Sequence, residues 1–332
     1  MEELITLDYG SGGKKTSELI ENILLPQIGN DKLSELGDGA IVEGFSELVF
    51  STDSFVVSPL FFPGGDIGKL SVCGTVNDIS VCGATAKYLS LAFIIEEGLP
   101  FATLKKIVNS ISNEAKKAGV IIVTGDTKVV ERGKADGIFI NTSGIGFLKH
   151  KGLSPKNIKP GDAVILSGTA GDHGAAVMLA RGDMLKGEIN SDCASLNELC
   201  SMVLDSGAGV RVLRDPTRGG VATTLNEFIE NTDLGIEIFE DKIPIAPKVE
   251  AACEILGLDP LYSANEGKIL AIVSADTAEK AVSAMRKTKE GKNAQIIGKV
   301  TEENPGKLIL RTKYGGGRIL QKLSGAQLPR IC

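Results

Sequence analysis

No two cysteines in this chain of 332 residues have Cys-x-x-Cys spacing, and only two histidines occur, so a zinc or iron–sulfur site is not expected. No apolar run approaches the roughly 20 residues of a membrane-spanning helix, which excludes a membrane segment. The N-terminus carries acid where a secretory signal carries base. The net charge of −6 argues against a nucleic-acid partner. We therefore expect a soluble, cytoplasmic protein.

Six cysteines are present, and five of them lie in apolar stretches with helical character. We expect these five to be small buried hydrophobic residues. The sixth, Cys332, is the last residue of the chain, where burial in a core is not expected. It is therefore the candidate for a reactive thiol.

The length and the 42 % hydrophobic content suit two domains with sizeable cores. Hydrophobic periodicity predicts two successive α/β halves, separated by turn residues at 151–155. A hairpin is expected over 307–323, followed by a tail without periodicity that we expect to be mobile. Fully extended, the nine residues 324–332 reach about 30 Å, far enough to enter a cleft. The predicted helices are 69–82, 101–118, 192–205, 221–230, 247–256 and 276–287, and the predicted strands are 48–57, 88–96, 120–123, 137–148, 163–166, 234–239, 268–273 and 294–300.

Four aspartates follow or interrupt apolar strand and helix patterns beside glycine or turn residues: Asp38, Asp53, Asp78 and Asp126. Unpaired carboxylates in such positions are costly to bury unless a cation neutralises them. Magnesium takes oxygen ligands and commonly shares them with phosphates. Each aspartate alone could equally cap a turn or a helix, but together they favour a metal site.

Four further features could take part in a site for phosphates or in proton transfer. The glycine-rich segment from Tyr9 to Thr16 carries lysines and could wrap phosphates, although it is not a Walker A motif and could be only a flexible arm. Lys128 could be a phosphate-binding cation, a base or a surface lysine. Glu266 precedes an apolar strand and is a candidate general base or a turn residue. Arg218 precedes a predicted helix and could help hold an anion, whereas His173 receives no role.

With these motifs in view, the chain resembles the HypE family of hydrogenase maturation proteins, within the superfamily of aminoimidazole ribonucleotide synthetase. The resemblance covers nearly the whole chain, and its terminal Pro-Arg-Ile-Cys is the part that looks specific to this family. The matching segments are Gly10-Ser-Gly-Gly-Lys14, Ser51-Thr-Asp-Ser54, Pro59-Leu-Phe-Phe-Pro-Gly-Gly65, Gly74-Thr-Val-Asn-Asp78, Val123-Thr-Gly-Asp-Thr-Lys-Val129, Gly168-Thr-Ala-Gly-Asp-His-Gly174, Thr217-Arg-Gly-Gly220, Ala264-Asn-Glu-Gly-Lys268 and Pro329-Arg-Ile-Cys332.

The resemblance implies a mixed α/β, two-domain PurM-like fold whose N-terminal half contributes strands to a β-barrel of a homodimer. It divides the chain into a flexible arm (1–35), an ATP-binding and dimerisation domain (36–152), a C-terminal α/β domain (153–305), and a hairpin with a mobile tail (306–332). It also implies site roles. Cys332, Lys128 and Glu266 would be catalytic; Gly12, Gly13, Lys14, Asp38, Thr52, Asp53, Asn77, Asp78 and Asp126 would bind ATP; and Asp38, Asp53, Asp78 and Asp126 would hold Mg²⁺.

The activity implied by the resemblance is an ATP-dependent dehydration. A HypF-type carbamoyltransferase would place a carbamoyl group on Cys332, this chain would convert the S-carboxamide to a thiocyanate, and a HypC–HypD complex would accept the cyanide for [NiFe]-hydrogenase. Two alternatives stay open: a superfamily enzyme that acts on a free molecule, and a carrier without catalytic activity. The resemblance does not settle whether the tail enters its own cleft or that of a partner subunit.

Overall fold

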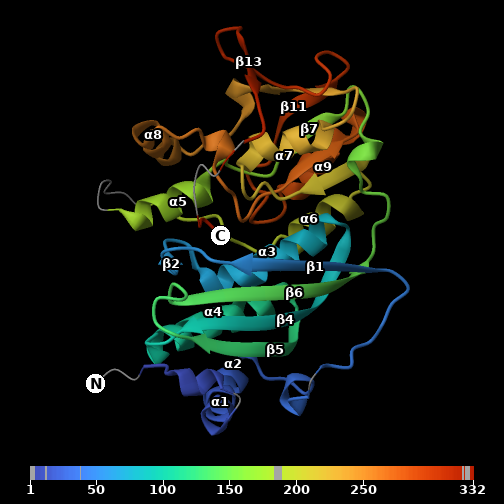
Figure 1. Ribbon diagram of the computed structural model, residues 1–332. Helices are drawn as coiled ribbons and strands as arrows, with labels where there is room; N and C mark the ends of the chain where they lie inside the picture. The colour runs from blue at the N-terminus through green and yellow to red at the C-terminus, as the bar shows by residue number, and fades with distance from the viewer. Residues whose placement is uncertain (1–3, 12, 38, 183–188, 324, 326–329) are drawn as a thin grey trace.

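The computed structural model describes residues 4–11, 13–37, 39–182, 189–323, 325 and 330–332. Two domains lie one above the other, and the chain ends between them (Figure 1). Within the described residues, no helix is long and apolar enough to cross a membrane. The helices are α1 (Lys14–Leu19), α2 (Leu25–Ile28), α3 (Ile67–Val81), α4 (Phe101–Ala118), α5 (Asp172–Arg181), α6 (Asn197–Asp205), α7 (Gly220–Ile229), α8 (Pro247–Leu256) and α9 (Ala278–Met285).

The strands follow the predicted order closely, with three additions that the periodicity did not indicate: β2, β3 and β8. They are β1 (Leu48–Phe55), β2 (Phe61–Phe62), β3 (Gly65–Asp66), β4 (Ala84–Glu96), β5 (Ile121–Val130), β6 (Ile138–Leu148), β7 (Ala163–Leu166), β8 (Val210–Arg214), β9 (Gly235–Phe239), β10 (Leu270–Val273), β11 (Gln295–Thr301), β12 (Leu308–Arg311) and β13 (Gly317–Leu320). The predicted hairpin is confirmed, because β12 and β13 pair antiparallel.

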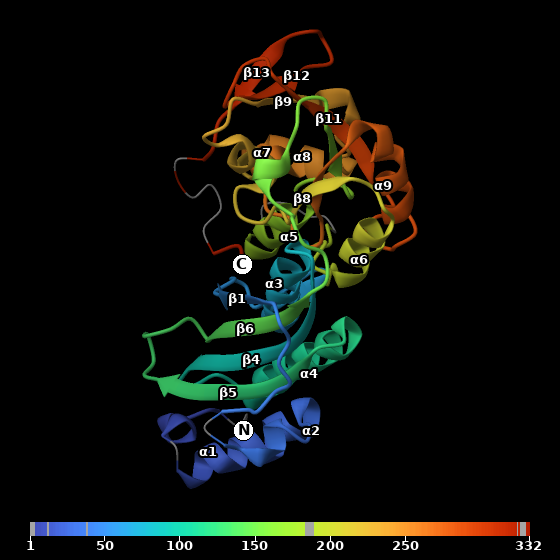
Figure 2. The same ribbon diagram turned by 90° about the vertical axis from the view of Figure 1, so that its right-hand side faces the viewer.

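The N-terminal domain is built on a four-stranded sheet of order β1-β6-β4-β5, in which only the β4–β5 pair is parallel. Helices α3 and α4 lie on one side of this sheet (Figure 2). Helix α3 is buried along nearly its whole length, as its uninterrupted apolar pattern predicts. On β1 the exposure alternates strictly, so that one face packs on α3 and the other stays open.

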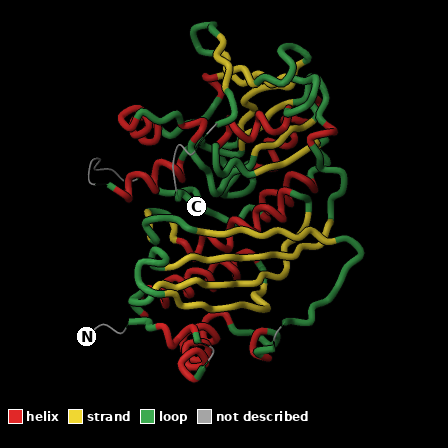
Figure 3. Tube along the Cα trace, in the orientation of Figure 1, coloured by secondary structure: helices red, strands yellow, loops and turns green. Residues whose placement is uncertain are grey.

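The C-terminal domain holds a seven-stranded sheet of order β13-β12-β9-β11-β7-β10-β8. Helix α7 packs on one face with Val164 and Leu166, whereas α6 and α9 pack on the other with Ala163 and Ile165. Strand β7 is therefore buried on both sides, which explains its continuous apolar sequence. Figure 3 shows the two sheets and the helices that flank them.

The N-terminal segment differs from the flexible arm expected over residues 1–35. Helix α1, a π-helical turn (Ile20–Leu24) and α2 follow one another directly. Ile5, Leu19 and Ile23 are buried in the same hydrophobic cluster as α4. The expectation gave weight to the glycines and lysines of this segment and overlooked the apolar spacing that follows them.

The end of the tail also differs from its expected mobility. The Val56 N–H donates to the carbonyl of Cys332 at 3.0 Å, and the Ser58 N–H donates to that of Arg330 at 3.3 Å. The Ile331 side chain is only 3 % exposed. Cys332 itself is half-buried, as expected outside a core, and its order comes from the backbone hydrogen bonds and the apolar anchor that the last residues add to the cleft of their own chain. Of the five cysteines expected to be buried, Cys82 is exposed at the end of α3.

Candidate active site between the two domains

Four carboxylates, two arginines and the terminal cysteine line a cavity of about 380 Å³ between the domains. Each domain contributes to it. The lining acids and their partners are Asp53 from β1, Asp78 from α3, Asp215 after β8, Arg218 before α7, Glu266 before β10, and Cys332 from the tail.

Local structure explains why the first two acids meet. Alternation along β1 turns Asp53 toward α3 and Thr52 toward the open face. A methyl group added at Gly74 of α3 would lie 3.4 Å from the Asp53 carboxylate and 2.8 Å from the Phe55 ring. A residue with a side chain at position 74 would therefore crowd the strand. Asp78, one turn further along α3, accepts a hydrogen bond from Ser51 Oγ at 2.6 Å.

Burial and mutual repulsion disfavour the charged forms of these acids. Burial, reinforced by Asp78, raises the pKa of Asp53 to about 6. Burial, reinforced by Asp78 and Asp53, raises the pKa of Asp215 to about 7. Burial also raises the pKa of Asp78. A cavity that holds several such acids favours the binding of a cation.

Glu266 is the most deeply buried acid of the group, with 2 % of its surface exposed. Its Oε1 atom is buried and has no hydrogen-bond partner in the structure. Burial first, and the nearby Asp215 second, raise the pKa of this carboxyl well above its usual range. Glu266 is thus a proton-holding group beside the tail, as a candidate acid or base requires.

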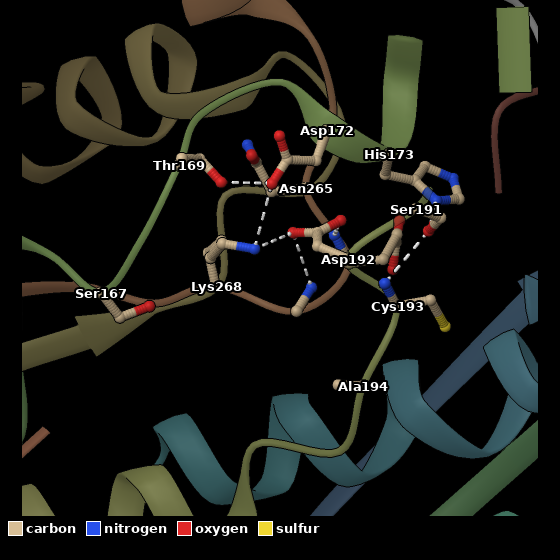
Figure 4. Close-up of polar contacts among 12 residues, drawn as sticks. Ser167, Thr169, Asp172, His173, Ser191, Asp192, Cys193, Ala194, Asn265 and Lys268 are labelled. Carbon is tan, nitrogen blue, oxygen red and sulfur yellow. Dashed lines mark hydrogen bonds and ion pairs between the residues drawn. The ribbon is translucent and has the colours of Figure 1, made fainter. Parts of the chain in front are cut away.

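The backbone of Glu266 is fixed by the carboxylate of Asp192. The N–H groups of Glu266 and Gly267 donate to the two Asp192 oxygens at 3.1 and 3.2 Å. Lys268 Nζ lies 3.0 Å from Asp192 and 3.4 Å from Asp172, so the two acids share one cation (Figure 4). A methyl group at Gly267 would lie 1.8 Å from the Asp192 carbonyl oxygen, which leaves room only for glycine.

The docked tail presents Cys332 to this cavity in its thiol form. Burial, followed by the charge of Glu266, raises the pKa of Cys332 to about 12. Arg330 also lines the cavity and holds the tail, since its Nε donates to the Val56 carbonyl at 3.0 Å and its guanidinium pairs with Asp136. Arg181 also binds the carbonyls of Ser58 and Arg330.

Asp126 and Lys128 lie elsewhere within the chain. They pair with each other at 2.6 Å and are about 60 % exposed. The prediction placed them at a strand end, but β5 continues to Val130, and both side chains point to the open face of the sheet. Asp53 points to the covered face three strands away, about 14 Å across the sheet. One chain therefore does not bring Asp126 together with Asp53 and Asp78.

The other predicted ATP ligands fall in three groups. Thr52 is on the open face, where it accepts from Ser143 Oγ at 2.8 Å. Asn77 is fully buried, and its side chain binds backbone groups of Ala194 and Leu196, so it joins the two domains and has no surface for a nucleotide. Gly13 caps α1, and Lys14 is 90 % exposed. Gly12 and Asp38 lie outside the described residues.

A second cavity, of about 200 Å³, lies between the N-terminal helices and β5. Its apolar walls include Ile20, Leu24 and Phe93, and its rim includes Asp126 and Lys128. Apolar walls beside a charged rim suit a ligand with a flat apolar part and a charged part. The site features thus form two groups: Asp126 and Lys128 beside this apolar cavity, and the acids with Cys332 in the cavity between the domains.

The acids of the domain cavity suit a divalent cation that shares its ligands with phosphates. In the part of the chain that the structure describes, no three His, Cys, Asp or Glu side chains form a ready metal site. Mg²⁺ commonly binds through one or two carboxylates together with phosphate oxygens and water. The raised pKa values of Asp53 and Asp215 and the unpartnered Glu266 oxygen match a site completed by such charge.

Sequence reasoning passed over three residues of this site. Asp215 was noted only as the start of the segment before Arg218, although an acid at the end of a strand is a usual sign of a ligand. Asp192 is the first residue of the helix predicted over 192–205 and belongs to no motif. Lys268 was part of a matched segment, but no sequence pattern reveals that it pairs with both Asp192 and Asp172.

The sequence matches two family models, described as the N-terminal domain (residues 37–148) and the C-terminal domain (residues 159–311) of AIR synthase related proteins. It is 49 % identical to carbamoyl dehydratase HypE of Cupriavidus necator, over 99 % of this chain and 95 % of the relative. The structure is similar to that of hydrogenase maturation protein HypE in complex with ATP, with a TM-score of 0.94, 45 % identity, and 98 % and 99 % coverage. It is also similar to a chain of the HypE–HypF complex, with a TM-score of 0.80, 50 % identity, and 92 % and 99 % coverage.

Proposed function

The chain belongs to the HypE family of carbamoyl dehydratases, and from that premise we propose that it dehydrates an S-carboxamide carried on its own Cys332, with ATP as the activating reagent. The observation that carries the proposal is the docked tail, which seats Cys332 in one cavity with Glu266 and Asp53. The reaction supplies the cyanide ligand for hydrogenase maturation.

The chemistry balances without a redox step. The carboxamide oxygen attacks the γ-phosphoryl group of ATP, and ADP leaves. The C–O bond then breaks with phosphate as the leaving group, while the nitrogen loses its protons and S–C≡N forms. The amide oxygen thus departs within phosphate, which is a far better leaving group than hydroxide.

Glu266 is the group we assign to a proton on the amide nitrogen. It shares the cavity with Cys332, and its backbone cannot drift because Asp192 holds two consecutive N–H groups. Its raised pKa makes it a strong base once ionised. Cationic charge in the cavity would favour that ionised form.

ATP binding and Mg²⁺ are proposed on the fit of the donor set. Asp53, Asp78 and Asp215 would hold Mg²⁺, which when bound neutralises charge on the transferring phosphoryl group. Arg218 lines this cavity just before the N-terminus of α7, a position that suits an anion. The apolar cavity behind β5 offers space for the adenine ring.

We also propose that the enzyme works as a homodimer closed through the open face of the N-terminal sheet. Leu48, Phe50 and Ile94 leave 47 %, 68 % and 45 % of their surface exposed there. Large apolar side chains gathered on one face are typical of a protein–protein interface. A second copy packed on this face and around the edge strand β1 would bring its Asp126 and Lys128 toward the first copy's Asp53. The dimer would thereby reunite the two groups of site residues.

The protein partners that we propose depend on whether the tail that carries Cys332 is docked or released. A docked Cys332 is protonated and enclosed, so it is a poor acceptor of a carbamoyl group. We propose that a HypF-type carbamoyltransferase modifies the released tail, and that a HypC–HypD complex takes the cyanide from it, both in the cytoplasm. One of the similar solved structures is itself a HypE–HypF complex.

Asp53→Asn separates the dehydratase from a carrier that merely presents a modified cysteine. The carbamoylated variant should fail to lose water when ATP and magnesium are added, whereas the matched wild-type chain should lose it within one turnover, as intact mass spectrometry would show. Equal conversion in the two proteins would remove the cavity acids from the reaction.

A further inference from the structure

His173 is buried completely, yet it is not part of the chemistry assigned above. It lies in the first turn of α5, at the edge of the domain cleft. Its Nε2 atom is 2.7 Å from the carbonyl oxygen of Ile331, the residue before Cys332. Its Nδ1 atom is 2.8 Å from Ser191 Oγ. The ring of Phe62 packs edge-on against it, with centroids 5.4 Å apart.

The partners determine where the proton of the imidazole resides. A carbonyl oxygen only accepts hydrogen bonds, so Nε2 must carry the hydrogen and donate it to Ile331. Nδ1 is then the acceptor, and it receives the Ser191 hydroxyl. Ser191 Oγ in turn accepts the N–H of Cys193 at 3.0 Å. Each atom in this chain has one consistent role, and burial lowers the pKa of His173, which keeps the ring neutral.

The segment around Ser191 holds both reaction partners. Ser191 donates a hydrogen bond to His173, which binds the tail (Figure 4). Its neighbour Asp192 accepts hydrogen bonds from the backbone N–H groups of Glu266 and Gly267. The Ser191 N–H is itself anchored to the Pro63 carbonyl of the other domain at 2.8 Å. Residues 191–193 thus determine where the tail lies relative to Glu266, the candidate base.

We propose that His173 is a positioning residue that docks the tail through the Ile331 carbonyl and so places Cys332 against Glu266. The purpose of the docking rests on the proposed function. The hydrogen bond from His173 to the Ile331 carbonyl, called the latch below, does not. It binds a backbone atom, so it holds the tail whether the cysteine carries a thiol, a carboxamide or a thiocyanate. Its strength sets the fraction of time that the tail is available to other proteins.

The latch is tested by the rate at which iodoacetamide alkylates Cys332 in the full-length chain without nucleotide. A Cys82→Ser background removes the exposed competing thiol. His173→Phe keeps a ring but loses the donor, and should speed alkylation about tenfold, the change expected for one buried hydrogen bond. His173→Gln offers an amide N–H near the Nε2 position and should restore much of the protection. His150→Phe, at the chain's other histidine, is the control and should react like the parent.

Ser191→Ala gives a second route if His173→Phe does not fold, because it leaves the ring in place and removes only the group that orients it. It should also speed alkylation, whereas Ser191→Thr should not. Single-turnover dehydration of the carbamoylated chains should slow in the same order. Unchanged alkylation in folded His173→Phe, or in folded Ser191→Ala, would overturn the latch. If alkylation changes as expected but the carbamoylated parent does not lose water, the latch stands and the proposed function fails.

Discussion

Asp53, Asp78, Asp215 and Glu266 line one cavity, and that arrangement costs the empty protein stability. Several of these carboxyls must either keep a proton or repel their neighbours once they ionise. Such a cost is typical of a binding site, where a ligand of opposite charge later removes it. The sequence suggested Asp53 and Asp78 as members of this group, because each interrupts an apolar pattern. Asp215 joins them only because the two domains are in contact, and no local sequence pattern predicts that contact.

Asp215→Asn should therefore stabilise the nucleotide-free protein while it impairs ATP-dependent turnover. The pKa of Asp215 is raised to about 7 in the folded chain, so the acid favours folding fully below about pH 4 and loses that contribution as the pH rises through 7. The variant should match the wild type near pH 4 and exceed its free energy of unfolding by on the order of 2–4 kcal/mol at pH 8. Urea unfolding at both pH values measures this. A variant less stable than the wild type at pH 8 would show that the ionised acid is already compensated in the empty protein.

At the scale of elements, regular periodicity predicted most of the framework. Helix α4 and strand β7 begin and end where the apolar pattern places them. Strand β5 was predicted too short, because Thr124–Lys128 reads as a polar turn, yet pairing with β4 extends it to Val130. The end of the tail shows no periodicity, and its order comes from hydrogen bonds to residues 56 and 58, which lie far away in sequence.

The turn that carries Glu266 allows a test at this scale. Gly267→Ala would place a methyl group 1.8 Å from the Asp192 carbonyl oxygen, and backbone atoms cannot move aside cheaply. We expect a loss of about 1–3 kcal/mol in unfolding free energy and a larger fractional loss of dehydration, since Glu266 must shift. Gly44→Ala is the matched control, because a methyl group there meets open space. Thermal melting and single-turnover assays would check both variants, and equal behaviour would show that the turn tolerates displacement.

At the scale of the whole molecule, the separation of Lys128 from Cys332 is the main departure from expectation. A single sequence gives no sign of which residues face a second copy of the same chain. The open face of the N-terminal sheet, with Phe50 exposed near its edge, offers the missing contact. In the proposed dimer, one complete set of site residues comes from two chains.

Subunit mixing tests that requirement. Lys128→Ala and Cys332→Ala homodimers should each be inactive, since one lacks the cation and the other the sulfur. After dissociation and reassociation of an equal mixture, some heterodimers should contain one complete site and recover part of the wild-type turnover. Phe50→Asp should be monomeric by light scattering and inactive. Recovery of no activity from mixtures that demonstrably contain heterodimers would place Lys128 outside a shared site.

The most direct measurement follows Cys332 itself by intact mass spectrometry after the chain has been carbamoylated and given ATP and magnesium. The account predicts that the modified chain loses the mass of one water, that phosphate appears in equal amount, and that neither change occurs in Cys332→Ala. A Cys332→Ala chain that hydrolyses ATP at the wild-type rate on a small free substrate would contradict it.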